Sequence, residues 1–267
     1  MRCSVITPNF NGELFLEQTI NTVLEHRENG IDLEYIVVDG GSTDKSHSIL
    51  EKYRSSIDRL IIEKDDGPAD AINKGLRAST GDVVAWLNAD DVYYPKALQR
   101  VIELFKADPS ISFAFGKCLI IDEKGSEIRE GITGFKEFFF PLNSRFTYQC
   151  INYISQPAMF FSRNALLDAG LLRTDMVAAW DYEFILRLWR QGKGVCIQGE
   201  PLSAFRWHVQ SISGQNFSLQ FKEEFDAAVE DAGKISLQAL IHAFVRWGIV
   251  GAYNGMKLVR STTSSKM

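Results

Sequence analysis

Short runs of Val, Ile and other apolar residues alternate with segments of helical period through the first 120 residues. Five of these runs are typical of strands: Ser4–Thr7, Tyr35–Asp39, Leu60–Glu63, Val83–Leu87 and Phe113–Leu119. Four segments between them have the period of helices: Leu14–Glu25, Lys45–Tyr53, Ala69–Arg77 and Lys96–Lys106. This alternation is typical of βα units and predicts an α/β fold with a mainly parallel sheet.

Each of the first four predicted strands is followed by a polar loop. The loops are Pro8–Gly12, Gly40–Asp44, Asp65–Pro68 and Asn88–Asp91. In open α/β sheets, ligands bind outside the carboxyl ends of the strands. We therefore expect the functional site at these loops.

The pattern changes near residue 125. Residues Gly131–Tyr153 are dense in aromatic side chains and have no clear period. Further helices are expected at Asn164–Ala169, Asp181–Gln191, Leu219–Asp231 and Ser236–Leu258. A second half of the molecule, rich in helix, begins there.

Composition and charge indicate a globular protein that does not bind nucleic acid. The 267 residues are 45% hydrophobic and 24% charged, which is ordinary for a globular protein. The formal net charge of −5 provides no basic field for a nucleic-acid backbone, so nucleic acid is not an expected partner. The four cysteines form no CxxC or Cys/His cluster and are expected as reduced thiols.

The start of the chain lacks the apolar stretch of a signal peptide. No run of 18 uncharged apolar residues occurs anywhere in the sequence. We therefore expect a cytoplasmic protein that does not span a membrane.

Two adjacent acids, Asp90 and Asp91, follow the predicted strand Val83–Leu87. Adjacent carboxylates repel unless a positive group lies nearby. A divalent cation shared with a diphosphate is one arrangement that resolves the repulsion. A helix cap beside a solvated neighbour is the other, and the pair alone does not decide between them.

A glycine pair follows the second predicted strand, in the segment Asp39–Asp44. The glycines permit a ligand to approach the backbone closely, and Asp39 could accept hydrogen bonds from a nucleotide base. A turn without a ligand fits equally well. The segment is not GxGxxG, and nothing in the chain matches GxxxxGK[ST].

Taken together, the motifs resemble those of the family-2 nucleotide-sugar glycosyltransferases of the GT-A fold. The motifs that carry the resemblance appear in family order within residues 3–214: Val5–Gly12, Ile36–Asp44, Asp66–Gly75, Trp86–Asp91, Gln156–Pro157 and Trp180–Glu183. The resemblance implies a Rossmann-like, mainly parallel central sheet with helices on the acceptor side. It also implies a GT-A domain over residues 1–215, with a nucleotide-sugar half at 1–122 and an acceptor and catalytic-base half at 123–215. A C-terminal helical extension would follow at 216–267.

The activity that the resemblance implies is inverting transfer of a sugar from a nucleotide-diphosphate sugar to an acceptor hydroxyl. The implied donor is a UDP-, GDP- or dTDP-sugar, the cofactor is Mn²⁺ or Mg²⁺, and the acceptor is a glycan or a lipid-linked glycan. Bacterial surface polysaccharide or lipid-linked glycan synthesis is the implied setting. A catalytically inactive nucleotide-sugar-binding scaffold is the alternative, against which the retained Asp91 and Asp181 argue.

Donor contacts are also implied by the resemblance. Thr7 and Pro8 would line the base pocket, and Asp39 would hold the edge of the base. Asp66 and the stretch Asp70–Gly75 would lie along the ribose and the donor sugar. The full implied set is Thr7, Pro8, Asn9, Asp39, Asp66, Gly67, Asp70, Asn73, Lys74, Asn88 and Asp90.

For the metal, the resemblance implies Asp91 as the binding acid of a DxD-like motif, with Asp90 on the ribose or the sugar. The first position of the motif is Asn88, which removes one negative charge. His208 matches a position that helps to bind metal or diphosphate in some relatives, although a lone His beside aromatic residues is often only packed. Arg206 would face the diphosphate or form an exposed ion pair.

Asp181 matches the acid that the family uses as general base on the acceptor hydroxyl. Many relatives have Glu-Asp where this chain has Trp180-Asp181. Glu183 is the competing candidate, and Asp181 would also be a good helix cap. Gln156, Trp180 and Glu183 are expected on the acceptor side.

The C-terminal segment Ile235–Met256 is apolar with a few polar interruptions. Three basic residues follow it: Lys257, Arg260 and Lys266. A helix resting on anionic lipid, a helix packed on the domain and a dimer interface all fit this pattern. The inner face of the plasma membrane is therefore an alternative location, and the sequence leaves the oligomeric state open.

Overall fold

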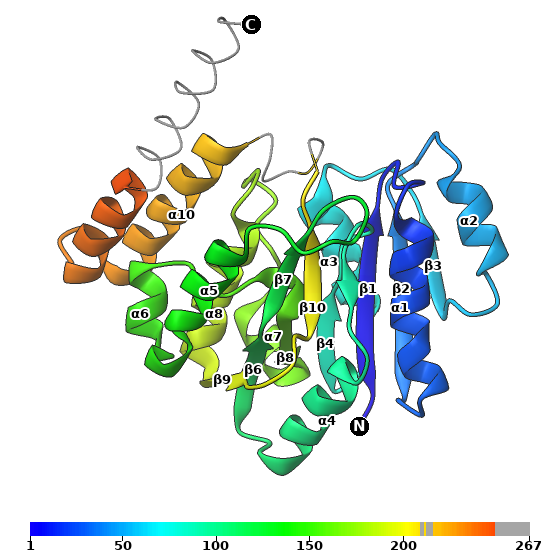
Figure 1. Ribbon diagram of the computed structural model, residues 1–267, viewed down its shortest axis with the longest axis horizontal. Coiled ribbons are helices and arrows are strands. Elements are labelled where there is room, and N and C mark those ends of the chain that lie inside the picture. Colours follow the sequence, from blue (N-terminus) through cyan, green and yellow to red (C-terminus); the bar gives the residue numbers. More distant parts are fainter. Residues whose placement is uncertain (209–210, 212–215, 249–267) are drawn as a thin grey trace, which may run out of the picture.

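A seven-stranded sheet forms the centre of the computed structural model, which describes residues 1–208, 211 and 216–248 (Figure 1). Its strand order is β3-β2-β1-β4-β8-β6-β9. The strands are β1 (Cys3–Asn9), β2 (Leu33–Asp39), β3 (Arg59–Ile62), β4 (Val83–Trp86), β6 (Ile111–Gly116), β8 (Met159–Ser162) and β9 (Lys193–Ile197). Only β8 runs antiparallel to its neighbours, so the predicted mainly parallel sheet is confirmed.

A second sheet of three strands lies beside the first. It consists of β5 (Val92–Tyr93), β10 (Ser203–Arg206) and β7 (Cys118–Ile121), in that order. The predicted single strand Phe113–Leu119 is therefore wrong, because β6 and β7 divide it between two sheets. The break follows Gly116, where a Cβ atom would lie 2.6 Å from Cδ1 of Leu202, so the close approach there requires glycine.

Helices cover both faces of the large sheet (Figure 1). The four helices predicted in the first half are present, with ends within three residues of the prediction: α1 (Leu16–Glu28), α2 (Ser46–Lys52), α3 (Pro68–Ala78) and α4 (Ala97–Ala107). The second half contains α5 (Glu130–Phe138), η1 (Phe140–Leu142), α6 (Arg145–Cys150), η2 (Gln156–Ala158), α7 (Arg163–Ala169), α8 (Trp180–Gln191) and α10 (Phe217–Ala232). Residues 237–248 are also helical, and the rest of the helix predicted to end at Leu258 lies outside the described residues.

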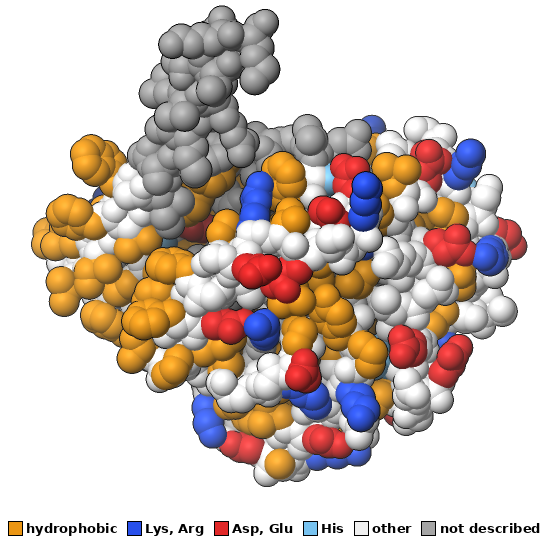
Figure 2. Space-filling view, in the orientation of Figure 1, with side chains coloured by type: hydrophobic (Ala, Val, Ile, Leu, Met, Phe, Trp, Pro, Cys, Tyr) orange, Lys and Arg blue, Asp and Glu red, His pale blue; other side chains and the backbone are white. Residues whose placement is uncertain are grey.

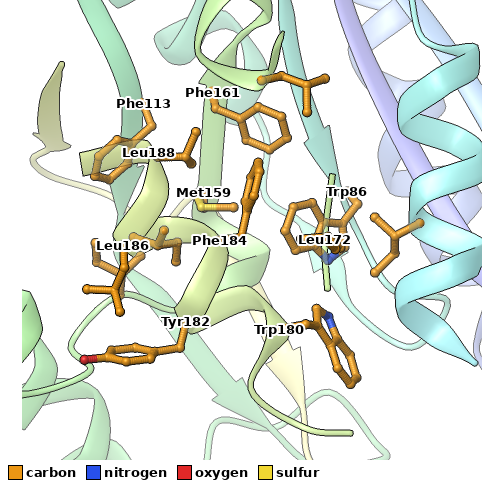
Figure 3. Close-up of a cluster of buried hydrophobic side chains, with 14 of the residues drawn as sticks. Trp86, Phe113, Met159, Phe161, Leu172, Trp180, Tyr182, Phe184, Leu186 and Leu188 are labelled. Carbon is orange, nitrogen blue, oxygen red and sulfur yellow. The ribbon is translucent and has the colours of Figure 1, made fainter. Parts of the chain in front are cut away.

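The core is divided into two layers by the large sheet. Successive side chains of a strand point to opposite faces, so Val84 and Trp86 of β4 pack in one layer and Val83 and Ala85 in the other. In the first layer, α8 places Phe184 against the sheet (Figure 3). Within the described residues, no helix is long and apolar enough to cross a membrane.

Candidate functional site

The ends of β1 and β2 bring two predicted donor contacts together. The parallel register pairs Asn9 with Asp39, and Nδ2 of Asn9 donates a hydrogen bond to Oδ2 of Asp39 at 2.6 Å. The Asp39 carboxylate also accepts from the backbone N–H groups of Gly41 and Ser42 and from the Ser42 hydroxyl. Asp39 is therefore buried and rigidly held, whereas Oδ1 of Asn9 is buried without a hydrogen-bond partner among the described residues.

Thr7 and Pro8 differ in how far they reach the surface. Thr7 is fully buried and its hydroxyl accepts a hydrogen bond from the Tyr35 hydroxyl at 3.1 Å. Pro8 is half-buried. Only Pro8 is therefore placed to touch a ligand directly, and Thr7 lies beneath it.

A charged cluster surrounds the start of α3. Oδ2 of Asp70 accepts from the backbone N–H of Asp66 at 3.3 Å and lies 3.3 Å from Nζ of Lys74. Lys74 also pairs with Glu63, at 3.1 Å. Gly67 has a φ of 114°, which a side chain would rarely adopt, and lets the chain turn into the helix. Four of the predicted donor contacts are thus brought together here.

Asn73 has a different position from the one predicted. Its side chain is buried, Nδ2 donates to the carbonyl of Leu172, and Oδ1 accepts from the Leu172 N–H, both at 2.9 Å. Both ends of this amide join α3 to the segment after α7. This arrangement fits a structural role and does not fit the predicted donor contact.

Asn88, which replaces the first acid of the DxD-like motif, connects two other motif residues. Its Nδ2 donates to Oδ2 of Asp91 at 3.1 Å and to Oε1 of Gln156 at 3.4 Å. Gln156 in turn donates to the carbonyl of Trp86 at 2.7 Å. Gln156 therefore fixes the end of β4.

Asp91 is fully buried. Oδ1 accepts from the Arg206 backbone N–H at 2.9 Å, and its carbonyl accepts from the Thr19 hydroxyl at 2.7 Å. Burial and the adjacent Asp90 carboxylate raise the pKa of Asp91 well above its ordinary value. These surroundings favour a structural role for Asp91 and do not fit the predicted metal contact.

Asp90 and His208, which are 118 residues apart in the sequence, are brought together by the fold. Oδ2 of Asp90 lies 2.9 Å from Nε2 of His208, and both side chains remain partly exposed, at 26% and 14%. The rings of Phe15 and His208 are 5.5 Å apart, which fixes the imidazole. Across the described ranges, no three His, Cys, Asp or Glu side chains are grouped as a ready-made metal site.

Arg206 takes neither of its two predicted roles. It is almost completely buried, and its guanidinium donates to the carbonyls of Asp90 and Asp122 and to Oε1 of Gln18, at 2.8–2.9 Å. It also lies over the Phe15 ring, 4.6 Å from the centroid. Arg206 therefore braces the loop that carries the two acids.

The first turn of α8 separates the two candidates for the general base. Asp181 is half-buried, with Oδ1 accepting from the Tyr182 N–H at 2.8 Å, and burial raises its pKa above the ordinary value. Glu183 forms two hydrogen bonds of 2.8 Å with Arg187. Because the Glu183 carboxylate is held by Arg187, Asp181 is the better candidate for the general base.

The Trp180 side chain belongs to the core. It is 8% exposed and joins the layer that contains Trp86 and Phe184 (Figure 3). Its indole therefore packs in the core and anchors the first turn of α8.

Two acids of α10 that the sequence analysis missed lie against this region. Glu223 accepts three hydrogen bonds of 2.8–3.0 Å from the backbone N–H groups of residues 177–179, immediately before α8. Glu224 is buried and accepts from Asn152 and Gln220. Burial, and to a lesser extent Asp181, raise the pKa of Glu224 to about 7. No local motif marks these acids, because the residues that Glu223 contacts and Asn152, which contacts Glu224, lie far away in the sequence.

The polar residues follow the carboxyl ends of parallel strands, where ligands bind in open α/β sheets. Comparison with known proteins defines the class of protein. The family model of Glycosyl transferase family 2 matches residues 4–169. The chain therefore belongs to this family, as the sequence motifs indicate.

Bacterial relatives are similar to parts of the chain. A putative teichuronic acid biosynthesis glycosyltransferase of Bacillus subtilis, TuaG, is 32% identical over 128 residues, covering 47% of this chain and 50% of the relative. An uncharacterized glycosyltransferase of Nostoc is 39% identical over 109 residues, covering 40% of this chain and 33% of the relative. The chain thus matches half or less of the length of these two proteins.

Solved structures share the fold. TarS of S. aureus in complex with UDP-GlcNAc has a TM-score of 0.66 at 19% identity, covering 86% of this chain and 67% of TarS. The mannosyltransferase PcManGT of Pyrobaculum calidifontis, in complex with GDP-Man and Mn²⁺, has a TM-score of 0.62 at 18% identity, covering 100% of this chain and 81% of the neighbour. The predicted GT-A fold is confirmed.

Proposed function

We propose that this protein is an inverting glycosyltransferase that moves a sugar from a nucleotide-diphosphate sugar to an acceptor hydroxyl. The observation that carries the proposal is the half-buried Asp181 at the start of α8, with its rival Glu183 engaged by Arg187. Membership of Glycosyl transferase family 2 supports the transfer of a sugar. The retained acid argues against an inactive scaffold.

The donor would bind at the ends of β1 to β4. Pro8 reaches the surface and would touch the base, while the buried, hydrogen-bonded pair of Asn9 and Asp39 would hold the ends of β1 and β2 beneath it. TarS binds UDP-GlcNAc and PcManGT binds GDP-Man, so UDP-, GDP- and dTDP-sugars all remain candidate donors. Asp66, Gly67, Asp70 and Lys74 would lie along the rest of the donor.

Asp90 and His208 are the residues that would hold a divalent cation, in place of the predicted Asp91. Their oxygen and nitrogen donors are 2.9 Å apart and partly exposed, whereas Asp91 is fully buried. Mg²⁺ and Mn²⁺ in such sites commonly take one or two protein ligands and complete their coordination with phosphate oxygens and water. A cation bound there would neutralise charge on the departing diphosphate.

Asp181 would accept the proton of the attacking hydroxyl. A carboxylate is a far weaker base than an alkoxide, so proton transfer must accompany formation of the new glycosidic bond. Burial raises the pKa of Asp181 and so makes it a stronger base than an exposed aspartate. The pKa shift therefore has the direction that a general base needs.

A glycan or lipid-linked glycan of bacterial surface polysaccharide synthesis is the proposed acceptor class. The support is the similarity to TuaG, whose name refers to teichuronic acid biosynthesis. We propose the cytoplasm, where nucleotide sugars would be available, as the place of action.

The test of this function is a calorimetric and kinetic panel. UDP, GDP and dTDP are titrated into the protein with and without Mn²⁺, and the matching nucleotide sugars are then assayed for transfer to glycan acceptors and for slow hydrolysis. We expect one nucleotide to bind in a Mn²⁺-dependent manner and its sugar to be turned over. Binding without any turnover would support the scaffold alternative, and no binding by any nucleotide would refute the proposal.

A further inference from the structure

The helix at residues 237–248 has an outer face that is almost entirely apolar. Leu237, Leu240, Phe244 and Trp247 recur at spacings of one helical face and are exposed by 60%, 57%, 78% and 83%. We call these four side chains the apolar face. In a helix that faces only water, these positions would carry polar side chains.

The opposite side of the same helix is packed on the protein. Ala239 and His242 are no more than 4% exposed, and Nδ1 of His242 lies 3.0 Å from the carbonyl of Gln149 in α6. Nε2 of Gln238 also donates to Oε1 of Gln149, at 3.2 Å. The helix is therefore docked with a defined orientation, and packing on its own domain does not explain the apolar face.

Neighbouring elements carry further apolar side chains that are exposed. Phe138 of α5, Leu142 of η1 and Phe146 of α6 are exposed by 70%, 55% and 47%. Figure 2 shows apolar side chains gathered over the end of the molecule that carries α6 and the helix at 237–248. A patch of this kind on a globular protein marks an interaction surface.

The charge of the C-terminal segment indicates which kind of partner suits the apolar face. From residue 232 to the last residue the sequence has five Lys or Arg and no Asp or Glu, although the whole chain has a net charge of −5. Two of these basic residues, Lys234 and Arg246, flank or belong to the described helix, and the other three lie outside the described residues. If a second copy of the chain docked here, the two basic segments would face and repel each other. An anionic bilayer would instead attract the basic segment.

We propose that the apolar face docks the protein on the surface of an anionic lipid bilayer. Trp and Phe side chains partition to the headgroup region, and an amphipathic helix with basic neighbours lies in the plane of the membrane. The inference does not depend on the proposed function. One consequence does rest on it: the ring of His242 lies 5.8 Å from that of Tyr182, next to Asp181, so the docked helix belongs to the half of the molecule with the proposed base.

The test is co-sedimentation of the full chain with phosphatidylcholine vesicles, with and without about 30% phosphatidylglycerol. The wild type should bind the anionic vesicles, more weakly at high salt. The double variant Phe244→Glu/Trp247→Glu should bind at least about tenfold more weakly, because it places charges in the bilayer. The matched control is Leu167→Glu, which adds a charge at an apolar side chain of α7 that is 68% exposed, and should bind like the wild type.

Two further measurements separate the outcomes. Brominated lipid should quench the fluorescence of the wild type, and Trp247→Phe should remove most of that quenching. Light scattering after gel filtration gives the oligomeric state of the wild type and the double variant. An equal melting temperature of the two proteins shows that the double variant is folded. Equal vesicle binding by the wild type and the double variant would overturn the proposal. A wild type that fails to bind anionic vesicles, including one that forms a dimer lost in the double variant, would also overturn it.

Discussion

Asp90 and Asp91 are adjacent in sequence but differ in accessibility. The Asp91 side chain points into the protein, where it accepts from Asn88 and from the Arg206 backbone. The Asp90 carboxylate stays partly exposed beside His208. An ion that still carries water and phosphate ligands must reach its carboxylate from solvent. The partly exposed Asp90 is therefore a better candidate for a metal ligand than the buried Asp91.

The first prediction is that Asp90→Ala removes the effect of Mn²⁺ on nucleotide binding. Calorimetry with UDP or GDP should then give the same dissociation constant with and without the metal. Asp91→Asn should instead lower the melting temperature, because one oxygen that accepts a hydrogen bond in the interior is replaced by an NH₂ group. If Asp91→Asn melts normally and alone abolishes the Mn²⁺ effect, then Asp91 is the ligand.

The second prediction separates the two acids of α8. Asp181→Asn should reduce sugar transfer by about 10²–10⁴-fold, the usual cost of losing a general base, with little change in donor affinity. Glu183→Gln is the control: it should keep transfer and lose only the contribution of its pair with Arg187, about 0.5 kcal/mol. Transfer is measured with an acceptor or as donor hydrolysis. Loss of transfer in Glu183→Gln with retention in Asp181→Asn would assign the base to Glu183.

At the scale of elements, α10 contributes to the position of α8. The first N–H groups of a helix and of the turn before it have no partners inside the helix. Before α8, the Glu223 carboxylate supplies those partners for residues 177–179. Its negative charge also lies near the positive end of the helix dipole. The C-terminal extension is therefore coupled to the turn that carries Asp181.

The third prediction follows from this contact. Glu223→Ala should destabilise the protein by about 1–2 kcal/mol, as for the loss of a helix cap, and should reduce kcat more than it weakens donor binding. Glu230→Ala is a suitable control, because Glu230 also lies on α10 but is exposed and pairs with Arg173 at the surface. Chemical denaturation and steady-state kinetics measure the two effects. Unchanged kcat in Glu223→Ala would show that α8 holds its position without this contact.

At the scale of the whole molecule, Glu224 makes stability depend on pH. Its folded pKa of about 7 lies above the ordinary value of 4.5, so the folded state binds the proton more tightly than the unfolded state. Glu224 therefore contributes stability that is fully present below pH 4.5 and is lost as the pH rises through 7. The shift corresponds to at most about 3 kcal/mol.

The fourth prediction is that Glu224→Gln removes this decline. The amide keeps an oxygen that can accept from Asn152 and Gln220 but does not ionise. The variant should gain stability relative to the wild type between pH 5 and pH 8, measured by denaturant unfolding at each pH. Buried His26, whose pKa is lowered to about 4, destabilises both proteins equally in acid and cancels in the comparison. A difference that stays constant with pH would refute the raised pKa.

Local patterns in the sequence were sufficient to predict the first half of the fold. The runs around Val5, Val37 and Val84 are strands because each is a continuous apolar segment long enough to be buried on both faces. The helices between them were predicted with ends within three residues of those in the structure. Their order also placed Asn9, Asp39 and Asn88 at one edge of the sheet, since the strands that carry them are parallel.

Only the tertiary structure decided the remaining strands and the division of roles among the polar residues. Strands such as β8 and β10 were not predicted from the sequence, and they exist because distant strands supply their hydrogen bonds. Burial is likewise set by what packs above a residue and not by its neighbours in the chain. The sequence by itself determined the family and the sheet, and the packing of remote segments decided that Asp90 is partly exposed whereas Asp91 and Asn73 are buried.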